Sequence, residues 1–225
     1  MPVSLVTGAN KGIGYAIAQL LVDAGHTVYV GARDIDRGQE AAIALGARFV
    51  QLDVTDDASV QTALESVTTT EGRLDLLVNN AGTSASGVEG PGALGVFDTN
   101  VVGVIRVTQA SLTVLQASAN PVVLNVTSDL GSFATVTDPT SRQYEIQAMV
   151  YSASKAAVNM LTVQYAKAYP AIKFNAVAPG FTATDLTEGR GRPVDQSAKA
   201  ILRMAFIGPD GPSGTLQDDD GQMPW

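Results

Sequence analysis

The sequence predicts a single α/β domain spanning residues 1–225: one doubly wound parallel sheet of about seven strands, with helices on both faces. Three observations support this fold class. Short apolar runs alternate with longer stretches of helical periodicity along the whole chain. The 225 residues suit one domain of ordinary size, and 45% of them are hydrophobic, enough for a substantial core. No internal repeat, low-complexity tract or linker divides the chain.

The predicted strands are short apolar runs of the kind that are buried on both faces of a sheet. Because strands and helices alternate, and parallel neighbours need a helical crossover, the sheet is predicted to be parallel. In chain order, the predicted strands are residues 3–6, 27–32, 48–52, 74–78, 122–126 and 172–177, with a last strand near Thr215 after the turn-rich segment 208–214.

The predicted helices repeat apolar residues at intervals of three and four, and particular residues mark their ends. Gly25 stops the first helix, and Asp56 or Asp57 caps the helix that runs to about Thr70. Segment 181–204, a glycine-containing loop followed by a short helix, is expected to be a substrate loop or lid. In chain order, the predicted helices are residues 13–24, 39–45, 56–70, 94–117, 151–168 and 195–204.

Composition excludes several kinds of site. The chain has no cysteine and a single histidine, His26, which excludes disulfides, thiolate nucleophiles, cysteine zinc sites and multi-histidine metal centres. We therefore predict no metal site, and we expect His26 to be structural. Any acid–base group of an enzyme must come from tyrosine, lysine, aspartate or glutamate.

Charge and hydropathy limit the partners. The net charge of −8 argues against nucleic acid, although a localised anion site needs only backbone N–H groups and one or two cations. No stretch approaches the ~20 apolar residues of a membrane span, so no membrane partner is predicted. The first strand pattern starts at Val3 and leaves no room for a cleaved signal sequence, so we expect a cytoplasmic location.

A glycine-rich turn, Thr7-Gly8-Ala9-Asn10-Lys11-Gly12-Ile13-Gly14, joins the first strand to the first helix. Gly8 permits a tight turn, Gly12 lets the backbone approach a pyrophosphate, and Gly14 lets helix and strand pack closely. The helix N-terminus presents free N–H groups and a positive dipole end to the phosphates. The turn therefore predicts a dinucleotide site. The expected cofactor contacts are Gly8, Asn10, Lys11, Gly12, Ile13 and Gly14.

The choice between NADP(H) and NAD(H) depends on the end of the second strand, Ala32-Arg33-Asp34. An NAD site has a carboxylate there for the adenosine ribose, and Ala32 has none. Arg33, together with Lys11 of the glycine-rich turn, suits a 2′-phosphate, so we predict NADP(H). In the alternative, NAD(H) binds, both cations are ordinary solvated side chains, and Asp34 supplies the carboxylate.

Further segments follow the glycine-rich turn in order. They are Asn79-Asn80-Ala81-Gly82, Asn100 in a long helix, Ser128 after the fifth strand, Tyr151-Ser-Ala-Ser-Lys155, and Pro179-Gly180. With these segments, essentially the whole chain resembles the short-chain dehydrogenase/reductase family, and in style the NADP-dependent carbonyl reductases. The resemblance implies a Rossmann-type fold and a catalytic group of Asn100, Ser128, Tyr151 and Lys155.

The chemistry of these residues supports such roles. Tyr151 and Lys155 are four residues apart, so their side chains share one face of a helix. A nearby ammonium is expected to lower the pKa of the Tyr151 phenol from about 10, which suits a general acid for ketone reduction and a general base for alcohol oxidation. Ser128, at the carboxyl end of a strand, is expected to hydrogen-bond the substrate oxygen. The resemblance implies that Lys155 also binds the nicotinamide ribose and that Asn100 holds a water near Lys155.

Each of these residues has a plainer interpretation. A tyrosine and a lysine at this spacing are commonly a surface pair, Ser128 could cap a helix or turn, and Asn100 could be an amide on a helix surface. Because all of these coincidences would have to fall at positions that match the family, catalysis is the favoured hypothesis.

The resemblance implies further cofactor contacts. Asp53 and Val54 would flank the adenine, Asn80, Ala81 and Gly82 would line the adenosine ribose and the floor of the site, and Pro179, Gly180 and Thr184 would hold the carboxamide. The chain departs from the family pattern at Thr182, where Val or Ile is usual, which leaves its carboxamide contact open. A second departure is the long interval from Ser128 to Tyr151, in which Phe133, Tyr144 and Met149 could cover the substrate.

The sequence thus predicts an NADP(H)-dependent short-chain oxidoreductase that transfers hydride between the nicotinamide and a ketone, aldehyde or secondary alcohol. Phe181, Leu186 and segment 130–149 favour a hydrophobic small molecule. One alternative is the same chemistry with NAD(H). The other is a dinucleotide-binding regulatory protein without turnover, which would not need the proton donor.

Small residues on the helix that carries Tyr151 permit a partner helix to pack closely, and they favour a homo-oligomer, either a dimer or a tetramer. They are Ala153, Ala156 and Ala157. The long segment before the tyrosine is also found in monomeric family members, so a monomer is the alternative.

Overall fold

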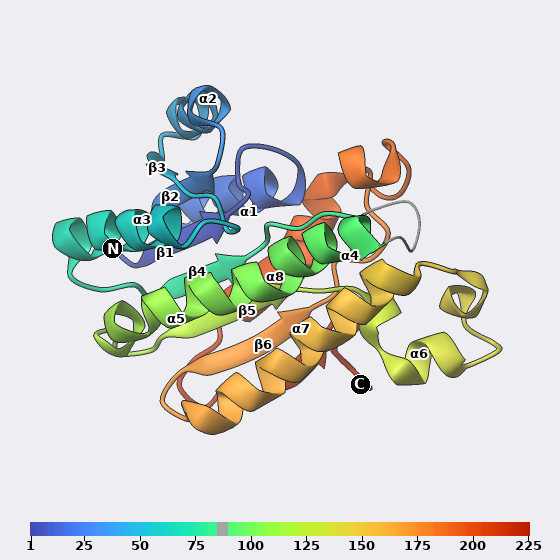
Figure 1. The fold of residues 1–225 in the computed structure, drawn as a ribbon. Coiled ribbons are helices and arrows are strands. Elements are labelled where there is room, and N and C mark those ends of the chain that lie inside the picture. Colours follow the sequence, from blue (N-terminus) through green and yellow to red (C-terminus); the bar gives the residue numbers. More distant parts are fainter. Residues whose placement is uncertain (85–89) are drawn as a thin grey trace.

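One sheet runs through the molecule. The computed structural model describes residues 1–84 and 90–225, and within them eight strands lie in the order β3-β2-β1-β4-β5-β6-β7-β8. Neighbouring strands are parallel except for the β7–β8 pair, which is antiparallel. Figure 1 traces the chain through the sheet. The strands are β1 (Val3–Thr7), β2 (Thr27–Ala32), β3 (Arg48–Gln51), β4 (Leu76–Asn79), β5 (Val122–Val126), β6 (Lys173–Val177), β7 (Thr215–Gln217) and β8 (Gln222–Met223).

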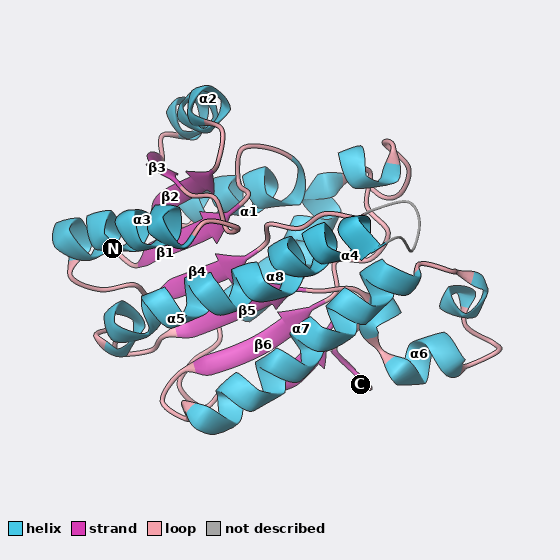
Figure 2. Cartoon of the chain, in the orientation of Figure 1, coloured by secondary structure: helices cyan, strands magenta, loops and turns pink. Residues whose placement is uncertain are grey.

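Helices cover both faces of this sheet (Figure 2). Helices α1, α2 and α8 pack on one face, and α3, α5 and α7 pack on the other. A π-helical turn, Asp98–Val102, joins α4 directly to α5. The helices are α1 (Gly12–Asp23), α2 (Ile35–Leu45), α3 (Asp57–Glu71), α4 (Gly90–Phe97), α5 (Gly103–Gln116), α6 (Phe133–Thr137), α7 (Met149–Ala168) and α8 (Val194–Ala205).

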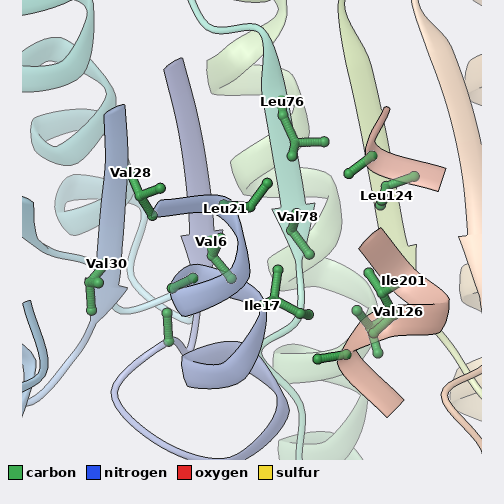
Figure 3. Close-up of a cluster of buried hydrophobic side chains, with 14 of the residues drawn as sticks. Val6, Ile17, Leu21, Val28, Val30, Leu76, Val78, Leu124, Val126 and Ile201 are labelled. Carbon is green, nitrogen blue, oxygen red and sulfur yellow. The ribbon is translucent and has the colours of Figure 1, made fainter. Parts of the chain in front are cut away.

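Each face has its own apolar core, because successive side chains of a strand point to opposite faces. On one face, Ile17 of α1 lies beside Val6 and Val78 of the central strands, and Ile201 of α8 lies beside Val126 of β5 (Figure 3). The other core includes Phe174 of β6, which is fully buried. Full burial of a side chain of this size contributes about 2–3 kcal/mol. The sheet is therefore a rigid platform for the loops at its carboxyl edge.

The fold class predicted from the sequence is confirmed, with differences in detail. The sheet has one strand more than predicted, because Gln222–Met223 returns antiparallel to β7. The predicted helix 39–45 begins earlier, at Ile35, because the Asp34 carboxylate caps it by accepting the Arg37 N–H at 3.0 Å. The predicted helix 94–117 is interrupted by the π-helical turn, and α6 interrupts the interval between Ser128 and Tyr151.

The strand order reverses at β1, which pairs with β2 on one side and with β4 on the other. In doubly wound sheets, ligands bind at the carboxyl ends of the strands beside such a switch point. Among the described residues, no helix is both long and apolar enough to cross a membrane. The same residues contain no group of three or more His, Cys, Asp or Glu side chains arranged to hold a metal ion.

Candidate active site

The glycine-rich turn follows β1 and leads into α1. Gly8 and Gly12 have left-handed backbones, with φ values of +63° and +57°, which glycine adopts without a steric penalty. A Cβ on Gly14 would lie 2.4 Å from Asn80 Nδ2 and 2.5 Å from the Gly8 carbonyl oxygen. Among the described residues, no side chain caps α1 at Lys11, and its first turn holds no acidic residue. The first N–H groups of α1 are therefore suited to an anion.

The segment after β4 is fastened to this turn. The Thr7 hydroxyl oxygen accepts the backbone N–H groups of Asn80 and Ala81, each at 3.0 Å. The Asn80 side-chain amide donates back to the carbonyls of Thr7 and Gly8, at 2.9 and 3.2 Å. Asn80, Ala81 and Gly82 therefore lie beside the glycine-rich turn, as the cofactor assignment requires. Thr7 belongs to the predicted turn, but the hydrogen bonds from Asn80 and Ala81 to its hydroxyl were not predicted.

Two of the predicted adenosine contacts follow β2 and β3. Arg33 is exposed at the end of β2 and contributes to the charge environment of Asp53. Burial alone would raise the pKa of Asp53, but the backbone N–H and hydroxyl of Thr55 donate to its carboxylate at 2.9 and 2.7 Å. With the added field of Arg33, the net result is a lowered pKa. Val54 is buried beside Gly103, whose Cβ would lie 2.9 Å from Val54 Cγ2.

Lys11 has a partner that the sequence did not predict. Its ammonium lies 2.6 Å from a carboxylate oxygen of Asp185, in the loop after β6, and both side chains are largely exposed. Lys11 is therefore shared between the glycine-rich turn and the predicted substrate loop. The carboxylate of Asp34, the alternative ribose ligand, caps α2 instead of standing free.

Asn100 lies in the π-helical turn and is 1% exposed. Its side-chain oxygen accepts the Thr83 N–H at 2.8 Å, and its amide donates to the Thr83 carbonyl at 2.9 Å and to the Ser154 hydroxyl at 3.0 Å. Ser154 in turn donates to the Tyr151 carbonyl at 2.7 Å. The interpretation of Asn100 as an amide on a helix surface is therefore wrong. Asn100 instead joins the segment after β4 to the first turn of α7.

Ser128 directly follows β5 and caps a 3₁₀ turn, Asp129–Gly131. Its hydroxyl accepts the Leu130 N–H at 3.2 Å and donates to the Asp129 carboxylate at 2.9 Å. Ser128 is therefore a turn cap, as its plainer interpretation held. The same hydroxyl also lies close enough to Tyr151 to oppose the rise in the pKa of that phenol. Capping and proximity to the tyrosine are therefore compatible.

Tyr151 and Lys155 share one face of α7, and the Lys155 ammonium lies 5.6 Å from the centroid of the Tyr151 ring. Lys155 is 5% exposed and donates to the Val126 carbonyl at 2.9 Å. Burial lowers its pKa to about 8. A Cβ on Gly82 would lie 3.7 Å from the Lys155 ammonium and 3.4 Å from Asn100 Oδ1. The residues predicted to be catalytic are thus brought next to the glycine-rich turn.

The expected acidity of Tyr151 needs correction. Burial raises the pKa of this phenol to about 12; the Ser128 hydroxyl opposes the rise and the Asp129 carboxylate adds to it. The expectation that the pKa of Tyr151 lies below its ordinary value is wrong, because desolvation of the buried phenol outweighs the opposing effect of the Ser128 hydroxyl. At neutral pH Tyr151 is a protonated hydrogen-bond donor.

The loop after β6 contains the predicted carboxamide contacts. Gly180 has a left-handed backbone with a φ of +68°. Thr182 is buried, and its hydroxyl bonds the Gly180 carbonyl at 2.9 Å and the Ser197 hydroxyl at 2.6 Å, so it is engaged within the protein. Thr184 lies across from the glycine-rich turn, with its Cγ2 3.6 Å from the position of a Cβ on Gly12. The loop therefore borders the same space as the turn.

The comparisons with known proteins agree with this geometry. The family model described as short chain dehydrogenase matches residues 2–194. This chain belongs to the short-chain dehydrogenase family. It is 33% identical over 244 residues to the short-chain dehydrogenase anuI of Penicillium roqueforti, covering 99% of this chain and 96% of the relative. It is 30% identical over 293 residues to salutaridine reductase of Papaver bracteatum, covering 97% and 94%.

Among solved structures, this short-chain dehydrogenase is similar to the NADPH-bound carbonyl reductase from chicken fatty liver. The TM-score is 0.89 at 29% sequence identity, and the match covers 100% of both chains. The Rossmann-like architecture is therefore shared from end to end.

Two arginines of this short-chain dehydrogenase hold the site together, and neither was predicted. Arg106 of α5 donates to the carboxylates of Asp57 and Asp98, at 2.8 and 2.7 Å, and to the Val54 carbonyl at 3.2 Å. It joins the predicted adenine segment to the π-helical turn. Arg192 donates to the Pro179 carbonyl, to the Ser197 hydroxyl and to Asp219, which fixes the turn at Gly180. Sequence alone did not reveal either role, since each arginine also binds a partner far along the chain, Asp57 for Arg106 and Asp219 for Arg192.

Apolar side chains gather between β5 and α7. Phe133, Tyr144 and Met149 are 71%, 50% and 64% exposed. A cavity of about 290 Å³ opens at the start of α7. It is lined by Val136, Ile146, Gln147, Ala148, Met149 and Ser152. This segment therefore offers an apolar surface near the tyrosine.

The exposed face of α7 retains the small residues of the oligomer prediction. Ala153 is exposed, and Ala156 and Ala157 are half-buried. Homo-oligomerisation through this helix stays a prediction.

Proposed function

We propose that this chain is an NADP(H)-dependent, carbonyl reductase-like oxidoreductase, in which Tyr151 is the general acid and base. It would transfer hydride between the nicotinamide and a ketone, aldehyde or secondary alcohol. One observation carries the proposal: the Tyr151 phenol, the Ser128 hydroxyl and the buried Lys155 ammonium lie together beside the glycine-rich turn. A protein that only bound a dinucleotide would not need the phenol and its hydroxyl partner.

A nicotinamide dinucleotide fits the residues around α1. The left-handed backbones of Gly8 and Gly12 shape the turn ahead of the first N–H groups of α1, which suit a pyrophosphate, and Gly14 leaves no space for a Cβ between the turn and Asn80. When bound, the cofactor supplies the hydride and, in its oxidised form, a positive charge. The proposed contacts are Gly8, Asn10, Lys11, Gly12, Ile13, Gly14, Arg33, Asp53, Val54, Asn80, Ala81, Gly82, Tyr151, Lys155, Pro179, Gly180, Thr182 and Thr184.

NADP(H) is preferred to NAD(H) in this proposal. Arg33 is exposed at the tip of β2, where a 2′-phosphate would lie, while the carboxylate of Asp34 caps α2. The chicken carbonyl reductase was solved with NADPH bound, which supports the same choice. Arg33→Asp should weaken use of NADPH at least tenfold more than use of NADH, because it replaces a bidentate cation with a carboxylate. An unchanged ratio of the two kcat/KM values would refute the preference.

The proposed proton transfer uses the phenol in its protonated form. With a pKa of about 12, Tyr151 carries its proton at neutral pH and donates it to a substrate oxygen that gains negative charge. The Ser128 hydroxyl, which donates to Asp129 in the structure, would turn to donate a hydrogen bond to the same oxygen, and the Lys155 ammonium would stabilise the phenolate that remains. Asn100 anchors the first turn of α7 through Ser154. That Asn100 also holds a water near Lys155 stays a proposal.

The proposed substrate is a hydrophobic carbonyl compound or alcohol. Exposed apolar side chains in the segment before Tyr151 and in the loop after β6 support this class: Phe133, Tyr144, Met149, Phe181 and Leu186. Salutaridine reductase, a relative named for reducing an organic substrate, points the same way. In this proposal, segment 181–204 is the substrate loop. Specificity depends on such loops, so the class is argued from these side chains and not from the fold.

A panel of aryl and alicyclic ketones and aldehydes, assayed by loss of NADPH absorbance, tests the function. Tyr151→Phe should retain NADPH binding within about threefold but lose on the order of 10³-fold in kcat, because it removes only the proton donor. Turnover by Tyr151→Phe comparable to that of the parent would eliminate the mechanism. NADPH binding without turnover on any carbonyl compound would favour the alternative, a non-catalytic dinucleotide-binding protein.

A further inference from the structure

Asn159 lies on the same face of α7 as the residues of the proposed proton relay. Tyr151, Lys155 and Asn159 are spaced by four residues each, so they form one row along the helix. Asn159 is 4% exposed, although its amide is one of the most strongly hydrated side chains. A buried amide needs partners, and those partners show what it holds.

Both ends of the Asn159 amide bind the segment that carries Ser128. Its side-chain oxygen accepts the Thr127 hydroxyl at 2.7 Å. Its amide nitrogen donates to the Gly131 carbonyl at 3.0 Å. Ser128 lies between these two anchors, so one side chain of α7 holds the residues before and after it.

The contact between this segment and α7 leaves no free space. A Cβ on Gly131 would lie 2.7 Å from the Lys155 carbonyl carbon and 2.9 Å from the Ala156 nitrogen. The Thr127 hydroxyl is also within 3.3 Å of the Lys155 carbonyl oxygen. The Ser128 segment therefore rests directly on the helical turn that presents Lys155, and it cannot shift along α7 while these contacts persist.

We propose that Asn159 is a positioning residue for proton transfer, which clamps Thr127 and Gly131 to α7 and so fixes the Ser128 hydroxyl relative to Tyr151. This inference rests on the proposed function, since it concerns the same hydroxyls. Asn159 itself touches neither the substrate nor the cofactor. It acts through the distance and angle between two groups, and a misplacement of about 1 Å can cost about 10²-fold in rate.

The test uses Asn159→Leu, a neutral change of similar size, and measures kcat with the fastest ketone of the panel. We expect kcat to fall between about 10- and 100-fold, with KM for NADPH changed less than about threefold, because only the hydroxyl alignment is altered. The kinetic pKa assigned to Tyr151 should rise, since the effect of the Ser128 hydroxyl, which lowers it, is weakened. A purely structural role would leave that pKa in place.

Thr127→Val provides a second variant, because Asn159→Leu removes the side-chain donor of the buried Gly131 carbonyl and leaves the Thr127 hydroxyl with only its 3.3 Å contact to the Lys155 carbonyl, which could prevent folding. Thr127→Val removes one anchor at nearly constant volume and should reduce kcat in the same manner, whereas Thr127→Ser keeps the hydroxyl and should restore it. The matched control is Thr162→Val. Thr162 is equally buried on α7, but it accepts the Asn125 amide at 2.9 Å, away from the Ser128 segment. Thr162→Val should lower the free energy of unfolding and leave kcat unchanged.

The parent, Tyr151→Phe and Ser128→Ala together separate failure of the inference from failure of the proposed function. If the parent turns over no carbonyl compound of the panel, or if Tyr151→Phe turns over as fast as the parent, the proposed function is wrong. If the parent is active and Ser128→Ala keeps full turnover, the Ser128 hydroxyl takes no part in proton transfer and the inference is overturned. If Ser128→Ala loses turnover while Asn159→Leu and Thr127→Val stay within twofold of the parent, only the inference is overturned. If the proposed function and the inference are both correct, the double variant Ser128→Ala with Thr127→Val should be no slower than Ser128→Ala alone, because the two changes act on one hydroxyl.

Hydrogen exchange tests the clamp without any turnover measurement. The Gly131 N–H donates to the Ser128 carbonyl at 2.9 Å. Its hydrogen exchange should accelerate at least tenfold in Thr127→Val and remain unchanged in Thr162→Val. Equal exchange in the two variants would overturn the clamp.

Discussion

The two regions that face each other across the proposed site attract negative charge by different means. At the start of α1, the attraction comes from backbone N–H groups and the helix dipole, and the nearest cation, Lys11, is exposed. On α7, the attraction comes from Lys155, whose ammonium is buried and has lost its hydration. The first region therefore depends on backbone shape and is insensitive to pH. The second depends on the protonation of one side chain.

The largest loss of NADPH affinity is expected from a change in the backbone shape of the glycine-rich turn. Gly14→Ala would place a methyl group 2.4 Å from Asn80 Nδ2 and 2.5 Å from the Gly8 carbonyl, which forces the glycine-rich turn away from Asn80. NADPH affinity should fall on the order of 100-fold, and overpacking should lower the free energy of unfolding by about 1–3 kcal/mol. Isothermal calorimetry and urea unfolding measure the two effects.

Gly95→Ala is the control for this change. A methyl group at Gly95, on α4, meets nothing within 4 Å in the described residues. It should stabilise the helix by about 1 kcal/mol and leave NADPH affinity unaltered. NADPH binding by Gly14→Ala at parental affinity would contradict the view that the turn works through its shape.

The next effect is the pH dependence of stability on the α7 side. Burial lowers the pKa of Lys155 from 10.5 to about 8, so between these values the unfolded chain holds a proton that the folded chain has lost. The contribution of Lys155 to the free energy of unfolding therefore increases with pH, on the order of 2 kcal/mol from pH 8 to pH 10. Lys155→Met should remove this increase. Denaturant unfolding at the two pH values checks it, and parallel curves for parent and variant would contradict it.

A smaller effect is expected from adding a side-chain cap to the N-terminus of α1, because α2 and α3 have such caps. Asp34 and Asp56 cap α2 and α3, and their carboxylates accept backbone N–H groups there. Lys11→Asn would supply α1 with such a cap, raising stability by about 1 kcal/mol while competing for the N–H groups. NADPH affinity should fall about tenfold through the cap and the lost cation together. Lys11→Ala removes the cation without adding a cap. If Lys11→Ala and Lys11→Asn have the same stability and the same NADPH affinity, the first N–H groups of α1 do not bind the cofactor.

The smallest effect concerns the ion pair between Lys11 and Asp185. Because both side chains are largely exposed, the pair contributes little to stability. Asp185→Asn should free Lys11 for the 2′-phosphate and raise NADPH affinity by about twofold, with NADH affinity unchanged. Fluorescence titration with both cofactors measures the difference. Weaker NADPH binding would mean that Asp185 orients Lys11 instead of competing for it.

Much of the fold was predictable because buried strands are apolar and bounded by turn residues. The strand at Thr27–Ala32 matches its prediction, and α8 begins one residue earlier than predicted, at Val194. The π-helical turn was not predictable, since its residues have the same apolar periodicity as an α-helix. Strand β8 was missed because its pairing with β7 depends on a turn and not on its own composition.

The geometry of the candidate site was predictable where it depends on local spacing, as in the glycine-rich turn and in the placement of Tyr151 and Lys155 on one helix face. Contacts between distant segments were not, because the sequence carries no sign of them: Lys11 and Asp185 are 174 positions apart. The pKa of Tyr151 was predicted in the wrong direction, since spacing on a helix reveals a neighbouring charge but not the extent of burial.

The π-helical turn Asp98–Val102 has a consequence for how this protein tolerates length changes. A π turn accommodates one residue more than an α-helical turn, so it acts as an inserted residue between α4 and α5. Deleting Val101 or Val102, the residues of the turn after Asn100, would allow one straight α-helix from Gly90 to Gln116 and would rotate the N-terminal part, with Asn100, by about 100° relative to α5. The apolar stripe of α5 would stay on the sheet while Asn100 swung away from Thr83 and Ser154. The extra residue therefore lets the apolar side of α5 face the sheet while the Asn100 side chain still reaches Thr83 and Ser154.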